Sequence, residues 1–291
     1  MSAVAPAVIG EARASEALAI VAGSGTLPFA VADAALGAGR AVVLFAIRNA
    51  ADPARVVAYR HHWLGIGQLS QLRRLARAEG CREMVLIGGV VRPRIRELLL
   101  DLEGLRFAWR VVQPFRGGDN HLLSQLLAQL ESYGFTIRGA HEIAPQIVVG
   151  VGPLGSRRPG AAEQADIARA LAVLNANSPF DVGQAAVVAG NRVLAIEGPE
   201  GTDQMLARVA AMRRGVRGTG VLVKAPKAGQ DRRVDLPSIG PRTIDAAASA
   251  GLAGIAVLAG SSIIAEPDRF AREADRANLF AVGVRADGSA E

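Results

Sequence analysis

The sequence predicts an α/β protein with two domains, an N-terminal open parallel sheet and a C-terminal α/β domain. Its 291 residues exceed what one hydrophobic core usually organises, because most domains hold roughly 100 to 150 residues. Half of the residues are hydrophobic and 21% are charged, which is typical of compact globular proteins. Short apolar runs also alternate with helical patterns along the chain, as in α/β folds.

The N-terminal half opens with a strand, a glycine-rich loop and a helix. Ala17–Val21 is a short apolar run, Gly23-Ser24-Gly25-Thr26 follows it, and a helical pattern begins at Leu27. Ala41–Ile47 is a continuous apolar run, as expected of a parallel strand covered on both faces. The alternation continues with a helix at Leu69–Ala78, a strand at Glu83–Ile87 and a leucine-rich helix at Asp119–Tyr133. We therefore predict a Rossmann-like domain over residues 15–138, preceded by a flexible extension at 1–14.

Glycine and proline crowd into residues 150–160, so we predict an interdomain linker over 139–160. The C-terminal domain then covers 161–291. It is expected to begin with a helix at Ala161–Leu174 and a hairpin of Gln184–Val188 with Arg192–Ile196. The remaining elements predicted are Thr202–Met212, Gly220–Val223, Thr243–Ala250, Gly254–Leu258, Pro267–Asn278 and Phe280–Val284.

Composition restricts the class of function. The apolar runs are far shorter than the ~20 residues that cross a bilayer, and the N-terminus lacks a signal-peptide pattern, so a cytoplasmic protein is expected. The single cysteine, Cys81, excludes an internal disulfide and is expected to be buried. The formal net charge of +6 favours an anionic partner. Only 4% of residues are aromatic, and no basic stretch interleaves with stacking residues, which speaks against nucleic acid.

Several short motifs allow both a structural and a functional interpretation. The glycine loop at 23–26 suits a phosphate at a helix N-terminus, although a plain tight turn explains it equally well. Asp119 is a good helix N-cap. The pair His61-His62 is expected in a surface loop, because no third ligand stands at metal spacing. His141-Glu142 lies at the domain junction, where a linking role is favoured over contact with a ligand.

Acidic residues gather around the predicted hairpin. Asp181-Val182-Gly183-Gln184 precedes its first strand, and Glu197-Gly198-Pro199-Glu200-Gly201-Thr202-Asp203 follows its second. Three carboxylates in the second segment attract a cation. The structural alternative is a capped helix start, because acidic residues stabilise helix N-termini.

The loop from Lys224 to Gly240 carries the strongest functional signal. It holds four cations, two carboxylates and two prolines, and loops of this length in compact domains are usually functional. Lys224 and Lys227 can neutralise a diphosphate. Asp235, between apolar Val234 and Leu236-Pro237, is placed like a rigid metal ligand or a general base, and the sequence leaves these two roles open.

Taken together, these motifs resemble the UDP-2,3-diacylglucosamine pyrophosphatase family of lipid A synthesis, the LpxI type, from about Leu18 to Val284. The resemblance rests on Val21–Pro28, Gly139–Glu142, Asp181–Gln184, Glu200–Asp203, Lys224–Lys227 and Arg233–Gly240. It implies a homodimeric hydrolase that binds its substrate between two domains and contacts lipid at the cytoplasmic face of the inner membrane. The implied cofactor is Mg²⁺, with Mn²⁺ as a substitute. The implied products are UMP and 2,3-diacylglucosamine 1-phosphate (lipid X), with water attacking the sugar-side phosphorus.

The resemblance also implies roles for individual residues. Asp235 and Lys224 would be catalytic, and Asp235, Asp119 and Glu200 would bind the metal. The implied substrate-binding residues are Gly23, Ser24, Gly25, Thr26, Leu27, Arg92, His141, Gln184, Lys227 and Gln230. Two departures from the family pattern, Gly89 before Arg92-Pro93 and Asn120 after Asp119, speak against ligand roles for Gly89 and Asn120.

Two other classes of function stay open from the sequence. A nucleotide-dependent oxidoreductase would explain the first glycine loop, but Ala41–Ile47 ends in Arg48-Asn49 rather than in the acidic residue that binds the ribose of NAD. A non-catalytic binder of nucleotide-sugars or acyl lipids would bind the substrate without turnover.

Overall fold

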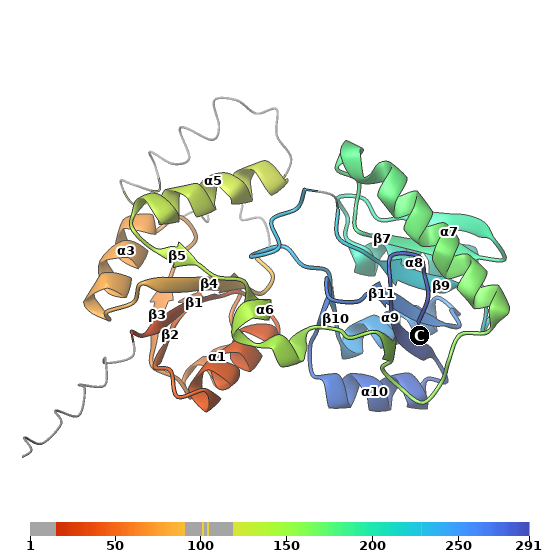
Figure 1. Cartoon of the computed structure of the whole chain (residues 1–291), viewed down its shortest axis with the longest axis horizontal. Helices are drawn as coiled ribbons and strands as arrows, with labels where there is room; N and C mark the ends of the chain where they lie inside the picture. The colour runs from red at the N-terminus through yellow and green to blue at the C-terminus, as the bar shows by residue number, and fades with distance from the viewer. Residues whose placement is uncertain (1–15, 91–100, 102–103, 105–118, 228, 291) are drawn as a thin grey trace, which may run out of the picture.

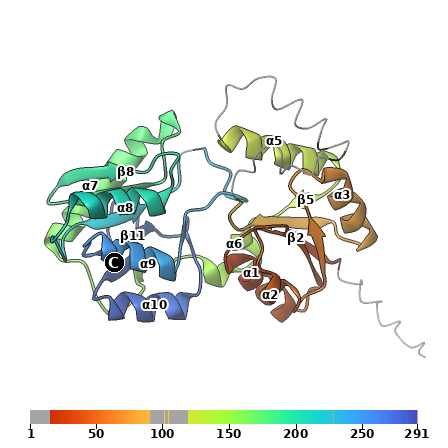
Figure 2. The ribbon, with the colours of Figure 1, turned by 180° about the vertical axis from the view of Figure 1, so that it is seen from behind.

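The computed structural model describes residues 16–90, 101, 104, 119–227 and 229–290. Two α/β halves lie side by side, each built around its own sheet (Figure 1), and the view from behind shows the same division (Figure 2). The predicted two-domain α/β fold is confirmed. The extension predicted at 1–14 falls outside the described residues. Among those residues, the longest helices are too short or too polar to cross a membrane.

The N-terminal sheet is parallel, with the strand order β3-β2-β1-β4-β5 within the described residues. Alternate residues of β1 explain its two-sided burial: Leu18 and Ile20 pack toward α1, whereas Ala19 packs toward α3 and α5. The two faces are thus covered by different helices, as a continuous apolar strand requires. The elements are β1 (Leu18–Ala22), α1 (Leu27–Gly37), β2 (Val42–Ile47), α2 (Pro53–Val56), β3 (His61–Leu64), α3 (Leu69–Ala78), β4 (Glu83–Ile87), α5 (Asp119–Ser132) and β5 (Thr136–Ile137).

The histidine pair corrects one prediction. His61 and His62 begin the edge strand β3 rather than a surface loop. The His62 ring stacks on Phe45, with centroids 5.6 Å apart, and its Nε2 lies 2.7 Å from Glu79 Oε1. The sequence pattern did not predict this strand, because a strand at the edge of a sheet can be polar and lacks the continuous apolar run of a buried strand. Cys81 is buried, as predicted, and burial raises the pKa of its thiol to about 11.

The C-terminal sheet is mixed, with the described strands in the order β6-β13-β11-β9-β7-β8. β9, β11 and β13 are parallel, and β7 and β8 form the predicted antiparallel hairpin. α7 covers one face, and α8, α9 and α10 cover the other. The elements are β6 (Gly152–Pro153), α7 (Ala161–Asn177), β7 (Ala185–Ala189), β8 (Arg192–Ile196), α8 (Thr202–Met212), β9 (Val221–Lys224), β10 (Ser238–Ile239), α9 (Pro241–Ser249), β11 (Gly254–Leu258), β12 (Ile263–Ile264), α10 (Pro267–Arg276) and β13 (Phe280–Val284).

The segment predicted as a linker, 139–160, is divided between the two halves. Its first part forms α6 (Ala140–Ile143) and a short 3₁₀ turn, Pro145–Ile147, and Ala140 and Ile147 join the N-terminal core. Its later part forms β6, which pairs with β13. The chain therefore crosses between the halves near residues 148–151.

A second connection between the halves is the loop of residues 225–237, which leaves β9 and reaches the N-terminal half (Figure 1). Val234 and Leu236 pack against the N-terminal cores. Arg233 Nη1 lies 2.6 Å from Glu131 Oε1 of α5. This loop belongs in sequence to the C-terminal half but is held by both.

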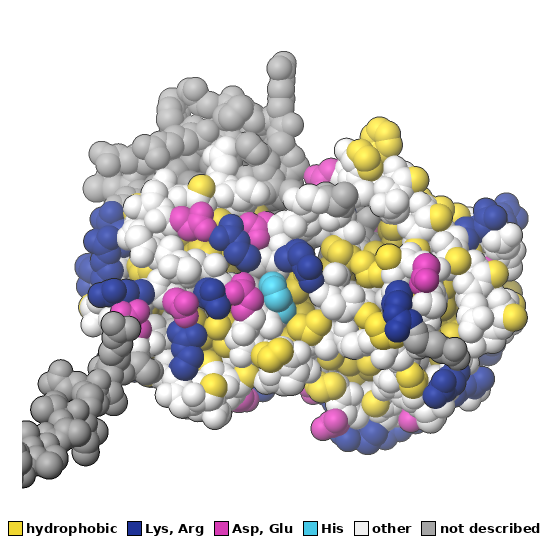
Figure 3. Space-filling model, viewed as in Figure 1, with side chains coloured by type: hydrophobic (Ala, Val, Ile, Leu, Met, Phe, Trp, Pro, Cys, Tyr) yellow, Lys and Arg dark blue, Asp and Glu magenta, His cyan; other side chains and the backbone are white. Residues whose placement is uncertain are grey.

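Basic and acidic side chains are interspersed over the N-terminal half on the face shown in Figure 3. On the C-terminal half, several basic side chains lie toward the outer edge of the same view. The net positive charge of the chain is therefore not gathered into a single patch on this face.

The loops after β1 and β4 touch through their backbones, and Gly23 permits this contact. A Cβ at Gly23 would lie 2.6 Å from the Gly89 carbonyl oxygen and 2.7 Å from that of Gly88. We expect Gly23→Ala to lower the free energy of unfolding by about 1–3 kcal/mol, because fixed backbone must move. Gly37→Ala is the matched control, since its Cβ would meet nothing within 4 Å. Urea unfolding measures both variants, and equal stabilities would contradict this account.

Candidate active site

A pocket of about 900 Å³ lies between the two halves. On the N-terminal side it is lined by residues that follow β1 and β4, including Ser24 and Gly88. These neighbouring strands mark a topological switch point, because α1 follows β1 on one face and α5 follows β4 on the other. On the C-terminal side the pocket reaches Lys224, at the end of β9. Ligands of open α/β sheets bind at this kind of position.

Helix N-termini from both halves line the pocket. They are Thr26-Leu27 of α1, Gly201-Thr202 of α8 and Gly240-Pro241 of α9. A helix N-terminus carries partial positive charge and backbone N–H groups without intrahelical partners. Their convergence favours a ligand with more than one negative charge.

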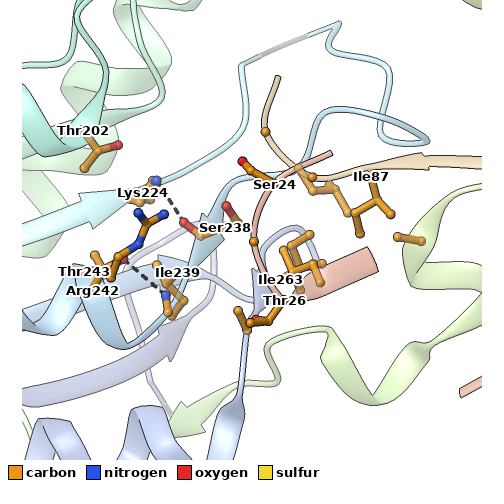
Figure 4. A pocket seen from close by; sticks show the side chains of 18 of the residues that line it. Ser24, Thr26, Ile87, Thr202, Lys224, Ser238, Ile239, Arg242, Thr243 and Ile263 are labelled. Atoms are coloured by element: carbon orange, nitrogen blue, oxygen red, sulfur yellow. Dashed lines mark hydrogen bonds between the residues drawn. The ribbon is translucent and has the colours of Figure 1, made fainter. Parts of the chain in front are cut away.

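Lys224 is buried at the end of β9, with 6% of its surface exposed. Its Nζ donates to the Ser238 carbonyl oxygen at 3.0 Å (Figure 4). Burial lowers the pKa of Lys224, and the neighbouring carboxylates of Glu197, Asp203 and Asp235 partly oppose this. The structure therefore places a cation in a poorly hydrated position on the pocket wall.

Asp235 lines the pocket from the loop that joins the halves. Its backbone N–H donates to the Asp231 carbonyl oxygen at 3.0 Å. Its flanking residues Val234 and Leu236 are held against the N-terminal cores. Within the described part of the chain, the Asp235 carboxylate forms no hydrogen bond or ion pair. Its backbone is thus fixed while its side chain stays available to a ligand.

Arg242 is a pocket residue that the sequence reading missed. It lies in the first turn of α9, where a cation is electrostatically disfavoured. In Figure 4 its side chain extends toward the same part of the pocket as Lys224. The signal was Pro241, because proline prefers the first helical position and so marks the start of α9. The predicted start at Thr243 left Arg242 outside the helix.

The glycine loop after β1 was expected to suit a phosphate, but two of its backbone N–H groups are already hydrogen-bonded within the protein. Gly23 N–H donates to the Ile87 carbonyl oxygen at 2.9 Å, and Ser24 N–H donates to that of Gly89 at 2.8 Å. These two amides are occupied because the β1 and β4 loops pair. Ser24, Gly25, Thr26 and Leu27 line the pocket, whereas Gly23 does not. The part of the loop open to a ligand is therefore the start of α1.

Gln184, just before β7, and Glu200, in the segment that follows β8, both line the pocket. Gln184 N–H donates to Glu197 Oε2 at 2.8 Å, and its Oε1 has no partner among the described residues. Glu200 Oε1 lies 2.6 Å from Arg208 Nη2. The carboxylate of Glu200 is therefore engaged with Arg208.

Other residues named from the sequence lie elsewhere. Lys227 Nζ is paired with Asp181 Oδ1 at 2.7 Å, and Gln230 Oε1 accepts the Lys227 N–H at 2.9 Å. His141 belongs to α6. These three residues do not line the pocket. Arg92 falls outside the described residues, and Asp119 begins α5 but its side chain is not described.

The described residues form no metal site made of protein ligands alone, because no three His, Cys, Asp or Glu side chains lie together among them. Magnesium does not require one, because it keeps several waters and often takes one or two carboxylates plus substrate phosphates. The unpaired carboxylate of Asp235 fits that mode of binding. Glu200 fits it less well because of its ion pair with Arg208.

Fold and site together define a two-domain α/β protein with a pocket between its halves, whose helix N-termini and buried lysine favour an anionic ligand. Residues 17–147 match the LpxI N-terminal domain, and residues 150–282 match the LpxI C-terminal domain. The chain is 40% identical over 272 residues to the UDP-2,3-diacylglucosamine pyrophosphatase LpxI of Caulobacter vibrioides, an alignment covering 92% of this chain and 97% of that protein. The chain belongs to the LpxI family, which confirms the resemblance at the family level.

Proposed function

We propose that this protein hydrolyses the pyrophosphate bond of UDP-2,3-diacylglucosamine to UMP and 2,3-diacylglucosamine 1-phosphate. The observation that carries the proposal is the pocket between the halves, where Lys224, helix N-termini and the unpaired Asp235 meet. The name of the Caulobacter relative supports the same substrate. The oxidoreductase alternative loses further support, because β2 ends at Ile47 and Arg48 follows it.

Charge neutralisation is the first task of the site. Hydrolysis of a diphosphate depends mainly on positioning and electrostatic stabilisation. Lys224, Arg242 and the N-termini of α1, α8 and α9 are the groups that would take up the negative charge of the phosphates. The buried position of Lys224 strengthens its interaction with an anion, because little water screens it.

Asp235 is proposed to bind Mg²⁺ together with substrate phosphates, and Mn²⁺ could replace it. The bound cation would neutralise phosphate charge and lower the pKa of a water molecule. Asp235 would otherwise act as the general base toward that water. In either role its carboxylate must face the phosphates, and its fixed backbone and free side chain support this.

Apolar residues line the same pocket and suit the lipid part of the substrate. They come from both halves and include Leu86, Leu236 and Ile263. We also propose that the protein works as a homodimer, as the family resemblance implies. We further propose that it acts at the cytoplasmic face of the inner membrane, because the proposed substrate is a lipid and basic proteins are attracted to anionic lipid. Analytical ultracentrifugation measures the oligomeric state, and a monomer would contradict the first proposal. Sedimentation with anionic lipid vesicles measures membrane binding, and protein that stays in the supernatant would contradict the second.

The direct test is to incubate the purified protein with UDP-2,3-diacylglucosamine and MgCl₂. We expect UMP and lipid X to form, EDTA to stop the reaction, and added Mg²⁺ to restore it. In oxygen-18 water the label should enter lipid X, because water is proposed to attack the sugar-side phosphorus. Label in UMP would refute that direction of attack, and no UMP with Mg²⁺ or Mn²⁺ would refute the function.

A further inference from the structure

Glu197 lies behind the pocket wall, one residue beyond β8, and only 7% of its surface is exposed. A buried carboxylate is costly unless it is hydrogen-bonded or paired with a cation. Glu197 Oε2 accepts the N–H of Gln184 at 2.8 Å, and Oε1 accepts the hydroxyl of Thr202 at 2.6 Å. Gln184 and Thr202 both line the pocket, whereas Glu197 does not. One carboxylate therefore holds two separate parts of the wall.

Gly183 makes room for this arrangement. A Cβ at Gly183 would lie 2.4 Å from the Glu197 carbonyl oxygen and 2.5 Å from its Cβ. The Gly183 N–H also donates to that carbonyl oxygen at 2.9 Å. The glycine of the Asp181–Gln184 motif thus permits Glu197 to pack beneath Gln184.

Lys224 and Glu197 lie on either side of Ala185 of β7: Lys224 is the residue opposite Ala185 on β9, and the Glu197 N–H donates to the Ala185 carbonyl oxygen at 2.8 Å. The nearby Glu197 carboxylate opposes the lowering of the Lys224 pKa by burial. The other neighbours of Lys224 of opposite charge are Asp203 and Asp235, which both line the pocket. Arg242 extends toward the same part of the pocket from α9 (Figure 4). Of the three carboxylates, Glu197 alone is buried behind the wall, so it would stay with Lys224 while the others face the ligand.

We propose that Glu197 is a positioning residue, which fixes Thr202 and Gln184 in the pocket wall and supplies the buried counter-charge of the Lys224 ammonium group. The proposal deepens the hydrolytic function proposed above and rests on it. Glu197 acts through its neighbours and makes no contact with substrate. Without its charge, Lys224 would lose its proton more easily and would neutralise phosphate less well at a given pH.

The chain offers a direct readout, because Lys224 and Lys227 are its only lysines. Protein labelled with ¹³C at lysine Cε gives two side-chain signals, which Lys227→Arg assigns. In Glu197→Gln we expect the Lys224 signal to titrate at lower pH than in the wild type, while the Lys227 signal stays in place. We expect kcat to fall at least ~10-fold, because small displacements in an active site are costly, and the alkaline limb of its pH profile to move to lower pH.

Two further variants separate positioning from charge and from general loss of stability. Glu197→Asp keeps the charge but is too short to hold both Gln184 and Thr202, so kcat should fall while the Lys224 titration stays near that of the wild type. Asp166→Asn is the matched control, because Asp166 is also a buried carboxylate and accepts N–H groups from Gly190 and Asn191. It should change stability without moving the Lys224 signal.

The outcomes distinguish this proposal from the function itself. Wild-type kcat and wild-type Lys224 titration in Glu197→Gln would overturn the role of Glu197. The same shift of the Lys224 signal in Asp166→Asn would overturn it as well. A wild-type protein that forms no UMP would refute the hydrolytic function, and the lysine spectra would still decide whether Glu197 is the counter-charge.

Discussion

Asp235→Asn should reduce turnover by roughly 10²- to 10⁴-fold, the range expected when a catalytic proton-transfer group is lost. Asparagine has nearly the same shape but cannot ionise, so it can neither hold a cation firmly nor accept a proton from water. The fold should be preserved, because the Asp235 carboxylate makes no hydrogen bond or ion pair among the described residues and interacts with Lys224 only at longer range. UMP release measures turnover, and urea unfolding checks stability.

The control for this variant is Asp268→Asn, which changes an exposed carboxylate in α10 outside the pocket. It should turn over like the wild type. Near-normal turnover in Asp235→Asn would remove Asp235 from the chemistry. Tight binding of the substrate by the wild type, without UMP release, would instead favour the non-catalytic binder.

Lys224→Met should lower kcat/KM by about 10²- to 10³-fold, comparable to the loss of a group that stabilises transition-state charge. Stability is expected to fall as well, because methionine leaves the buried Glu197 carboxylate without its counter-charge and the Ser238 carbonyl oxygen without its donor. Lys227→Met is the comparison, since it removes an ion pair with Asp181 outside the pocket. A larger loss of activity in Lys227→Met than in Lys224→Met would contradict the placement of the two lysines.

The pH dependence of stability gives an independent check on Lys224. Burial lowers its pKa from the ordinary value of 10.5, so between the lowered value and 10.5 the unfolded state binds more protons than the native state. Stability therefore rises with pH over this window. Lys224→Met should lack this contribution, which urea unfolding at a series of pH values can measure. An identical pH dependence in both proteins would show that Lys224 is not desolvated in the native state.

The elements with strong local patterns could be predicted from sequence. The range predicted for α8, Thr202–Met212, agrees with the structure at both ends. β11 also agrees, because an apolar run between glycine and turn residues is a sufficient local signal. β3 was missed because its polar histidines gain their partners, Phe45 and Glu79, only through tertiary contacts.

The candidate site could be predicted only in part. The loop after β9 stood out by its length, charges and prolines, and it does bring Asp235 to the pocket. The two lysines of the loop, Lys224 and Lys227, look alike in the sequence, because only the fold buries the first and pairs the second with Asp181. Glu197 was noticed as one of several acidic residues, but its burial depends on the space left by Gly183.

The loop of residues 225–237 has a consequence for how the protein unfolds. Val234 and Leu236 are packed by the N-terminal half, while Ile239, just beyond them, belongs to the core of the C-terminal half. Melting of either half would therefore expose apolar surface on a segment that the other half also holds. Unfolding of one half is therefore partly coupled to unfolding of the other. A ligand bound to this loop would stabilise both halves against denaturation.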